Sequence, residues 1–380
     1  MKLSKKNKIG VVSLFIIVLI MVLLFFSPPS NNTKYPIVQE FQSTLLTHDL
    51  YLDSKNILST KKLTNKIKNT DVDTIFKKYL KDMDRYGKYF TQEEYSAFKE
   101  SMKVNYVGIG MFLYQQKNDD RIFCFPFEDK LLRSGVALYD ELISVDGKLV
   151  KNQNIYIVSS WIRGEEGTSV AIEIKKSLRS RTVLTLKRKK YNFNSVQWVE
   201  DNGTTMLQIL HFTQNTPTEL SEALHLWPND IPVVIDLRDN SGGDYLAAVD
   251  SADLFLPKDT LISEIKTKER TLIHVAKVAD TLQGRQVVLI QNALTASASE
   301  VFIAALSQNL RAVSIGEKTY GKGVAQKFVE LSNHSALLLT YAKIFTPDGT
   351  SYDEVGLEPT SKSSIKDLLN EYMEEKIDIK

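Results

Sequence analysis

Pro232-Val-Val-Ile-Asp-Leu237 is a nearly continuous apolar run, and Gln286-Val-Val-Leu-Ile290 is a second one. Apolar runs without polar alternation are typical of parallel strands that are buried on both faces. Helical patterns follow both runs, from Leu246 to Leu256 and from Ser299 to Leu310. Strands that alternate with helices predict an α/β layer domain, and we assign residues 191–362 to it.

Two further patterns precede this domain and predict an α+β chain of several domains. Between residues 104 and 190, short apolar or alternating runs are separated by Gly, Asp and Asn, as in Val145-Asp-Gly-Lys148. This arrangement is typical of a compact, mostly β domain. We expect its strands at residues 107–114, 121–125, 141–145, 170–174 and 182–186.

Residues 38–103 have helical spacing and predict a small helical N-terminal subdomain. An apolar stripe recurs there at i, i+3, i+4, i+7 and i+8, and it consists of Val72, Ile75, Phe76, Tyr79 and Leu80. Thr91 and Glu94 have the spacing of a capping box, which predicts that another helix begins at this point. Residues 363–380 predict a charged C-terminal helix. A homodimer that forms through the terminal helices is one option, and the sequence leaves it open.

The N-terminus has the pattern of a membrane-targeting segment. A basic tail, residues 1–8, precedes an uncharged apolar run, residues 9–26, which is just long enough to cross a bilayer. The lysines of the tail favour the cytoplasmic side. We therefore expect a single-pass signal anchor in the cytoplasmic membrane, with the chain beyond the linker 27–37 on the extracytoplasmic (periplasmic or extracellular) side. A cleaved signal peptide is the alternative, although small residues do not follow the run.

Composition and motif spacing argue against several classes of ligand. The chain has 48 basic and 46 acidic residues, so its net charge of +2 offers no basic field for nucleic acid. The short run Lys187-Arg-Lys-Lys190 is interpreted as the solvated end of a strand. Cys124 is the only cysteine, and the histidines form no His-Glu-x-x-His motif. Residues 316–322 match the spacing of a phosphate-binding loop up to its lysine. The next residue is Gly323, whereas such a loop needs Ser or Thr there to hold Mg²⁺. We expect no metal, no cofactor and no nucleic acid partner.

Two segments of small residues carry the candidate chemistry. They are Thr295-Ala-Ser-Ala-Ser-Glu300 and Gly316-Glu-Lys-Thr-Tyr-Gly-Lys-Gly-Val-Ala-Gln326. A serine hydroxyl becomes a nucleophile when a nearby base takes its proton, and a lysine whose pKa is lowered by burial can be that base. If Ser297 and Lys322 meet, the protein is a hydrolase of the Ser-Lys type. Ser299 is interpreted as a helix cap or a residue of the helix surface.

These segments, with further motifs in the same order, resemble the carboxyl-terminal processing (tail-specific) serine protease family. Val234-Ile-Asp-Leu-Arg-Asp-Asn-Ser-Gly-Gly243 is similar to the family's "DLRxNxGG" strand and turn. Thr295–Glu300 is similar to its nucleophile segment, and Tyr320-Gly-Lys-Gly323 with Gln326 is similar to its lysine segment. Its closing signature corresponds to Phe345-Thr-Pro-Asp-Gly349 and Val355-Gly-Leu-Glu-Pro359. The resemblance covers most of the chain after the apolar run.

The resemblance implies a role for each matching residue. Ser297 corresponds to the nucleophile and Lys322 to the general base, and Gln326 would orient the lysine through a hydrogen bond. The backbone N–H groups of Gly243 and Ala298 correspond to the oxyanion donors. A shift of one residue, from Gly243 to Gly242, stays open.

The same resemblance implies that residues 104–190 form a PDZ domain. Tyr106-Val-Gly-Ile-Gly110 is similar to the carboxylate-binding loop, so Gly108, Ile109 and Gly110 would bind a peptide C-terminus. Two further segments, Glu141–Gly147 and Arg163–Thr168, are similar to the "DxIxxVDG" and "RGxxGT" motifs. One stretch departs from the family pattern. Residues 127–136 replace the usual "GSPAxxAGL", which leaves the tail preference open.

Together these expectations describe a helical N-terminal subdomain, a mostly β PDZ domain and an α/β Ser-Lys protease core. Such a chain would be a serine endopeptidase that captures protein or peptide substrates with exposed C-termini and cleaves them with a Ser-Lys dyad. The alternative belongs to another class of protein. It is a membrane-tethered PDZ adaptor whose protease fold is catalytically silent.

Overall fold

A computed structural model gives the structure of the chain. The residues that it describes are 36–52, 60–67, 70–101, 106–115, 119–176, 180–191, 194–201, 203–229, 231–282 and 284–378. Within these ranges no helix is both long enough and apolar enough to cross a membrane. The expected anchor at residues 9–26 lies outside the described residues.

A five-stranded sheet forms the centre of the C-terminal half, and its strand order is β10-β11-β12-β15-β16. The pairs β11–β12, β12–β15 and β15–β16 are parallel, whereas β10 and β11 form an antiparallel hairpin. This confirms a mixed α/β fold with buried parallel strands. The strands are β10 (Val196–Asp201), β11 (Thr204–Ile209), β12 (Val233–Asp236), β15 (Val287–Gln291) and β16 (Val313–Gly316).

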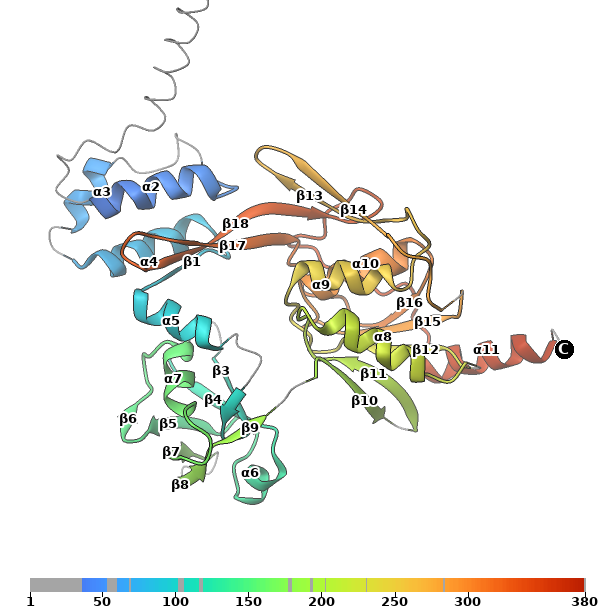
Figure 1. Cartoon of the computed structure of the whole chain (residues 1–380), viewed down its shortest axis with the longest axis horizontal. Helices are drawn as coiled ribbons and strands as arrows, with labels where there is room; N and C mark the ends of the chain where they lie inside the picture. Colours follow the sequence, from blue (N-terminus) through green and yellow to red (C-terminus); the bar gives the residue numbers. More distant parts are fainter. Residues whose placement is uncertain are drawn as a thin grey trace, which may run out of the picture.

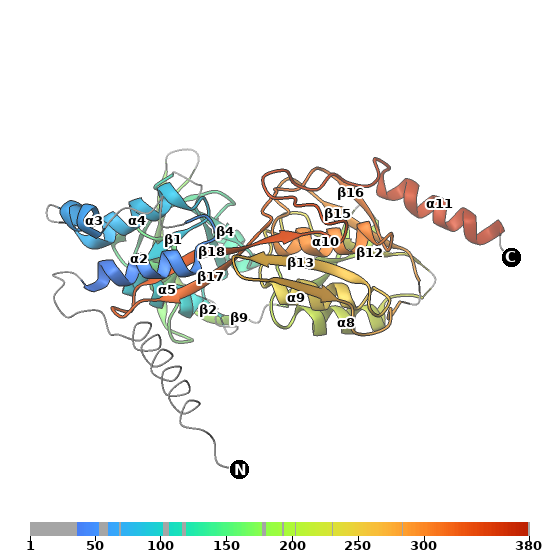
Figure 2. The same ribbon diagram turned by 90° about the horizontal axis from the view of Figure 1, so that it is seen from above.

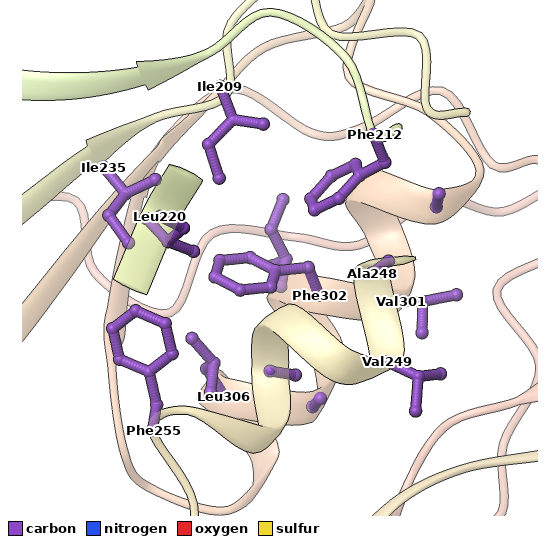
Figure 3. Packing of buried hydrophobic residues seen from close by; sticks show 14 of the residues in the cluster. Ile209, Phe212, Leu220, Ile235, Ala248, Val249, Phe255, Val301, Phe302 and Leu306 are labelled. Atoms are coloured by element: carbon purple, nitrogen blue, oxygen red, sulfur yellow. The ribbon is translucent and has the colours of Figure 1, made fainter. Parts of the chain in front are cut away.

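Helices cover both faces of this sheet, because its strands are apolar on both sides. Val233 and Ile235 point to the face that is covered by α8 (Thr216–Leu226), α9 (Tyr245–Asp253) and α10 (Ala298–Gln308). Phe302 of α10 lies at the centre of this cluster, and its ring contacts Phe212 and Phe255 at centroid distances of 5.7 Å (Figure 3). On the opposite face, the apolar residues Ile365, Leu368 and Leu369 of α11 (Ile365–Asp378) pack against Val234 and Val288.

A second sheet is antiparallel and packs on the far side of α9 and α10. Its strands are β1 (Lys88–Phe90), β13 (Leu261–Thr267), β14 (Thr271–Val275), β17 (Val324–Glu330) and β18 (Ala336–Phe345). The order β1-β18-β13-β14, with β17 also paired to β18, joins the two ends of the chain in one sheet. Figures 1 and 2 show β17 and β18 as a long ribbon that leaves the core and reaches the N-terminal helices.

The N-terminal helices pack on the tip of this β17–β18 hairpin. They are α2 (Pro36–His48), α3 (Thr60–Ile67), α4 (Val72–Met83) and α5 (Gln92–Ser101). The predicted stripe of α4 is confirmed, since Ile75, Phe76, Tyr79 and Leu80 are buried. The predicted capping box is also present. Thr91 Oγ1 accepts from Glu94 N–H at 3.2 Å, and Glu94 Oε2 accepts from Thr91 N–H at 2.9 Å.

Residues 106–191 form a β unit with a hydrophobic core of its own. The predicted strands are present, but the first one is divided in two. Gly110 adopts φ +81°, a left-handed value that favours glycine, and the chain turns there between β2 and β3. The elements are β2 (Tyr106–Gly108), β3 (Met111–Tyr114), β4 (Ile122–Pro126), α6 (Asp129–Arg133), β5 (Glu141–Val145), β6 (Lys148–Leu149), α7 (Ile155–Ile162), β7 (Ser169–Lys175), β8 (Arg181–Lys187) and β9 (Lys189–Tyr191).

The interpretation of residues 187–190 as a solvated strand end is wrong for Arg188. This side chain is only 9% exposed. Its guanidinium donates to the carbonyl oxygens of Trp161, Ile162 and Ser169 at 2.8–3.0 Å. Because an arginine has five donors in a rigid fork, it can join the end of α7 to the start of β7 from within the unit. Sequence alone does not distinguish this arginine from its exposed lysine neighbours.

Candidate active site

A cavity of about 470 Å³ lies between the antiparallel second sheet and the N-terminal ends of α9 and α10, and it is lined by all five residues that the sequence predicts for catalysis. They are Ser297, Lys322, Gln326, Gly243 and Ala298. The rest of the wall is mainly apolar and comes from α9 and from strands β13, β14, β17 and β18. Its members are Asp244, Tyr245, Leu246, Ile265, Leu272, His274, Val324, Ala325, Tyr341 and Ile344.

Ser297 lies on a sharp turn between β15 and α10 and is the N-cap residue of that helix. Its backbone has φ +57° and ψ −116°, which is uncommon for a residue with a side chain. The turn packs closely on the preceding glycine turn. A Cβ atom on Gly242 would lie 2.8 Å from the Ser297 Cβ and 2.8 Å from the Ala296 carbonyl oxygen. Only glycine at position 242 therefore allows Ser297 this position.

The interpretation of Ser299 as a cap or a surface residue is wrong. Ser297 is the cap, and Ser299 is fully buried in the first helical turn. Its hydroxyl donates to the Asn240 carbonyl at 3.1 Å. Ser299 therefore ties the start of α10 to the glycine turn at residues 240–243.

Lys322 lies in the loop between β16 and β17, and its amine faces the cavity. Lys322 Nζ donates to Gln326 Oε1 at 2.8 Å. Burial lowers the pKa of the Lys322 amine below its ordinary value, because the ammonium form loses its hydration. The carboxylates of Asp84 and Glu300 oppose this shift by stabilising the ammonium form. The lowered pKa favours the neutral amine that a general base requires.

Gln326 is fixed from the other side by the N-terminal part of the chain. Gln326 Nε2 donates to the Tyr86 carbonyl oxygen at 2.8 Å. The Tyr86 ring also lies 5.4 Å from Lys322 Nζ, within the range of a cation–π contact. Tyr86 was not among the site residues predicted from the sequence. No local signal marks it, since it is far from Lys322 along the chain.

Glu300 connects the serine turn to the lysine loop, and this role was not predicted from the sequence either. Its side chain is fully buried. One carboxylate oxygen accepts from the N–H groups of Ser297 (2.7 Å) and Lys322 (2.8 Å), and the other accepts from Thr319 Oγ1 (2.6 Å) and Gly321 N–H (2.7 Å). Burial raises the Glu300 pKa, while these four hydrogen bonds oppose the shift. The Ser-x-x-Glu spacing of a capping box, present at residues 297–300, could have pointed to it.

The two glycines of the turn differ in the hydrogen bonds of their N–H groups. Gly242 N–H already donates to Asn240 Oδ1 at 2.9 Å. Among the hydrogen bonds of the described residues, the N–H groups of Gly243 and Ala298 have no acceptor. Gly243 has φ +138°, and a Cβ atom there would lie 2.1 Å from the Phe212 carbonyl oxygen, so no other residue fits.

The predicted peptide-binding residues Gly108, Ile109 and Gly110 do not line this cavity. They lie in the β unit, where Ile109 is buried. The Gly110 carbonyl accepts from the N–H groups of Phe127 and Glu128 at 3.0 and 3.2 Å. The stretch that departs from the family pattern therefore packs directly on this loop. Among the described residues, no group of three or more His, Cys, Asp or Glu side chains is placed to hold a metal ion.

Comparisons with known proteins show a resemblance to serine proteases. Residues 203–363 match the sequence pattern of peptidase family S41. A "Probable CtpA-like serine protease" of Staphylococcus haemolyticus is 31% identical over 284 residues, which are 73% of this chain and 57% of the relative. The "Carboxy-terminal processing protease CtpA" of Bacillus subtilis is 28% identical over 335 residues, which are 86% of this chain and 72% of the relative. These matches confirm the predicted family resemblance.

A solved structure shows the same fold. It is described as a photosystem II D1 C-terminal processing protease, and it superposes with a TM-score of 0.61 at 21% identity. The superposition covers 86% of this chain and 92% of that protein.

Proposed function

We propose, from the match of residues 203–363 to peptidase family S41, that the chain is a serine endopeptidase with a Ser297–Lys322 dyad. The observation that carries the proposal is the shared cavity, into which a serine on a strained turn and a lysine with a lowered pKa both face. The relatives are proteases by name, and the cavity is large enough for a substrate side chain.

The catalytic cycle follows from these groups. The neutral Lys322 amine takes the proton of the Ser297 hydroxyl, and the serine oxygen attacks the carbonyl carbon of the scissile peptide bond. When the carbon–nitrogen bond breaks, the lysine returns the proton to the leaving amine, and an ester to Ser297 remains. Water then attacks the ester, with Lys322 again accepting a proton, and the acid product leaves with the serine restored.

Backbone N–H groups at the serine turn would stabilise the negative oxygen of each tetrahedral intermediate. We assign this role to Gly243 and Ala298, because the N–H of Gly242 is already engaged with Asn240. Loss of one such donor typically lowers the rate by about 10²–10³-fold. Glu300 holds the serine turn and the lysine loop in register. It binds the backbone of Ser297 and of Lys322 with one carboxylate oxygen.

We assign substrate capture to the β unit, as a PDZ domain. Its sheet has the order β3-β4-β5-β7-β8, so β3 is an edge strand that can pair with an extended peptide. The loop Gly108–Gly110 leads directly into β3, and its N–H groups would bind the terminal carboxylate. The substrates in this proposal are proteins with exposed C-termini.

The location remains a proposal that rests on residues 1–26. We assign the basic tail and the apolar run to a signal anchor, with the protease outside the cytoplasmic membrane. Fractionation of cells that express the full chain, followed by protease accessibility, tests this. Recovery of a soluble product shortened at the N-terminus would instead support a cleaved signal peptide. Light scattering of the purified protein tests the homodimer.

The dyad is tested with an alkyl fluorophosphonate, which labels a serine only when a base activates its hydroxyl. The wild-type chain should be labelled at Ser297, whereas Ser297→Ala should not react and Lys322→Ala should react at least about 100-fold more slowly. Ser307→Ala is a matched control, since this serine lies on the same helix and donates to the Ile303 carbonyl. Wild-type protein that fails to react would favour the silent adaptor.

Substrate capture needs a second assay with a natural kind of substrate. An unfolded reporter with an apolar C-terminal tail should be cleaved by the wild-type chain and not by Lys322→Ala. The same reporter with an amidated C-terminus should be cleaved more slowly, because it lacks the terminal carboxylate. Equal rates for the two reporters would contradict the assignment of the β unit.

A further inference from the structure

We propose that the turn at residues 84–87, which joins α4 to β1, is a positioning element for the general base. Tyr86 and Asp84 of this turn set the orientation of Gln326 and the electrostatic environment of Lys322. The proposal rests on the proposed function, because it takes Lys322 as the base. The proposal implies that the active site is complete only when the N-terminal helices are packed on the C-terminal half.

The Tyr86 carbonyl decides which atom Gln326 presents to the lysine. A carbonyl oxygen can only accept a hydrogen bond, so the Gln326 amide nitrogen must face it. The amide oxygen is then turned toward Lys322 Nζ and accepts from it. If the Tyr86 carbonyl moved away, the amide could rotate and point its NH₂ group at the lysine. A neutral lysine amine that donates to Gln326 keeps its lone pair free for the serine proton.

The Tyr86 side chain forms one wall of the lysine environment. Its ring lies 5.4 Å from Lys322 Nζ, and its hydroxyl is 3.5 Å from Asp353 Oδ1. Asp353 Oδ1 in turn accepts from Gly323 N–H, next to the lysine, at 3.1 Å. Tyr86 therefore contacts Lys322 through its ring, and its hydroxyl is linked to the lysine loop through Asp353.

Asp84 fixes the turn to the strand that pairs with β17. Asp84 is fully buried. Its carboxylate accepts from Thr340 N–H at 2.9 Å, from Thr340 Oγ1 at 3.0 Å and from Tyr86 N–H at 2.9 Å. Thr340 lies directly opposite Gln326 in the β17–β18 ladder. One buried carboxylate thus connects the turn, the strand and the register position of Gln326.

The charges around Lys322 make the proposal testable by the direction of a pH shift. Asp84 and Glu300 stabilise the ammonium form, and burial destabilises it. Further titratable groups that lie near the site on the surrounding elements include Tyr86 and Arg85 in the turn, Tyr320 in the lysine loop, Asp353 and Glu354 after β18, Tyr341 on β18, His274 on β14 and Asp244 before α9. Asp84 is the carboxylate of the turn at residues 84–87, and it acts on the Lys322 amine.

The experiment measures the rate of Ser297 phosphonylation by an alkyl fluorophosphonate from pH 5 to pH 10. In this step the serine oxygen bonds to phosphorus, fluoride leaves and Lys322 takes the proton. The rate rises with pH as the lysine loses its proton. Asp84→Asn should move this rise to lower pH, by about one pH unit, because an ammonium-stabilising charge is lost. Tyr86→Leu should lower the limiting rate at high pH about tenfold, because the base is less well positioned.

Conservative and distant variants show whether a changed rate comes from a misplaced Lys322 or from a loss of folding. Tyr86→Phe keeps the ring and the backbone and should stay within about twofold of the wild-type limiting rate. Asp71→Asn removes a carboxylate that caps α4 at Thr74 N–H, and Tyr95→Leu removes a ring from α5. Neither residue contacts the lysine, so neither variant should shift the pH profile.

The outcomes distinguish the two proposals. If Asp84→Asn moves the rise to higher pH, the turn acts only as a cover that keeps water from Lys322, and the inference is wrong. An unchanged profile in both Asp84→Asn and Tyr86→Leu also overturns it, provided that circular dichroism shows both variants to be folded. Wild-type protein that reacts as slowly as Ser297→Ala would remove the proposed function, and the inference with it.

Discussion

The N-terminal helices and the β unit at residues 106–191 both lie in the first half of the chain, but their cores are built differently. All buried members of the β unit's core come from the unit itself, from Ile109 to Ile174. The core of the N-terminal helices is shared with the other end of the chain. It includes Leu331, Leu337 and Leu339 of the β17–β18 hairpin.

The contacts of the two regions with the rest of the chain differ in the same way. The β unit meets the N-terminal helices mainly where α7 packs on α5, through Phe98 and Tyr156 at a ring distance of 5.0 Å and through Arg163. The N-terminal helices, in contrast, pack on the hairpin that carries Gln326. A change in the helices should therefore reach the catalytic cavity, and a change in the β unit's core should not. Four measurements test this difference.

The largest effect is expected for Phe76→Ala in α4. Phe76 is fully buried, and its ring stacks on Phe41 at a centroid distance of 3.8 Å. Truncation of a buried phenylalanine costs about 3–5 kcal/mol of unfolding free energy. Because this core includes the hairpin, we expect fluorophosphonate labelling of Ser297 to fall together with the stability. Urea unfolding and labelling of the same sample measure both. Unchanged labelling in a variant whose helices have unfolded would contradict the comparison.

Ile172→Ala makes the corresponding change in the core of the β unit. Ile172 is fully buried there, and its truncation should cost about 2–5 kcal/mol. Since this core is separate, we expect Ser297 labelling within about twofold of wild type, while cleavage of the tailed reporter falls. Hydrogen exchange should show the loss of protection confined to residues 106–191. A parallel loss of protection in β17 and β18 would mean that the two regions unfold as one.

Arg163→Ala tests the contact between the two regions. The Arg163 guanidinium donates to the Glu100 and Ser101 carbonyls at the end of α5, and it lies over the Tyr106 ring. We expect a loss of about 1–2 kcal/mol, since two hydrogen bonds from a charged donor are removed. Limited proteolysis should then release the β unit faster. Lys99→Ala is the control, because this exposed lysine contacts Glu330 and the Tyr95 ring, which both lie outside the β unit.

The smallest effect concerns Asp49, which follows α2, and it depends on pH. Asp49 is buried, its Oδ2 has no hydrogen-bond partner among the described residues, and burial raises its pKa to about 6. The protonated form is thus favoured in the folded state, so its contribution to stability is present below pH 4 and is lost as the pH rises through 6. Asp49→Asn should raise stability on the order of 1 kcal/mol at pH 7.5 and not at pH 4. Melting curves at the two pH values measure it, and an equal change at both would contradict the assignment.

Local patterns in the sequence were enough to predict much of the fold. The apolar runs at 232–237 and 286–290 became buried parallel strands, and the stripe on α4 and the capping box at Thr91 were also confirmed. Each depends on residues that are neighbours along the chain. The order of motifs also predicted the family, because that order is a property of the sequence itself.

The contacts that were missed join residues far apart in sequence. Tyr86 accepts a hydrogen bond from Gln326 with its backbone carbonyl, and every residue type has such a carbonyl, so the sequence does not indicate this contact. Arg188 resembles its lysine neighbours until the fold buries it. Glu300 was within reach, since its spacing from Ser297 fits a capping box, but its bonds to Thr319 and Gly321 require the lysine loop to fold over it. Periodicity and propensity carry no information about such pairings.

The shared core of the N-terminal helices has a consequence for synthesis. A chain emerges from the ribosome N-terminus first, and domains generally fold as they emerge. The β unit can follow this order, because its whole core is present once residue 186 has appeared. The apolar core residues between Val38 and Tyr89 cannot complete their packing in this order, because the same core includes Leu339, which is synthesised much later. If the helices do complete the lysine site, as inferred above, a truncated or unfinished chain stays inactive. The cell is then exposed to an active protease only after the chain has been made almost to its end.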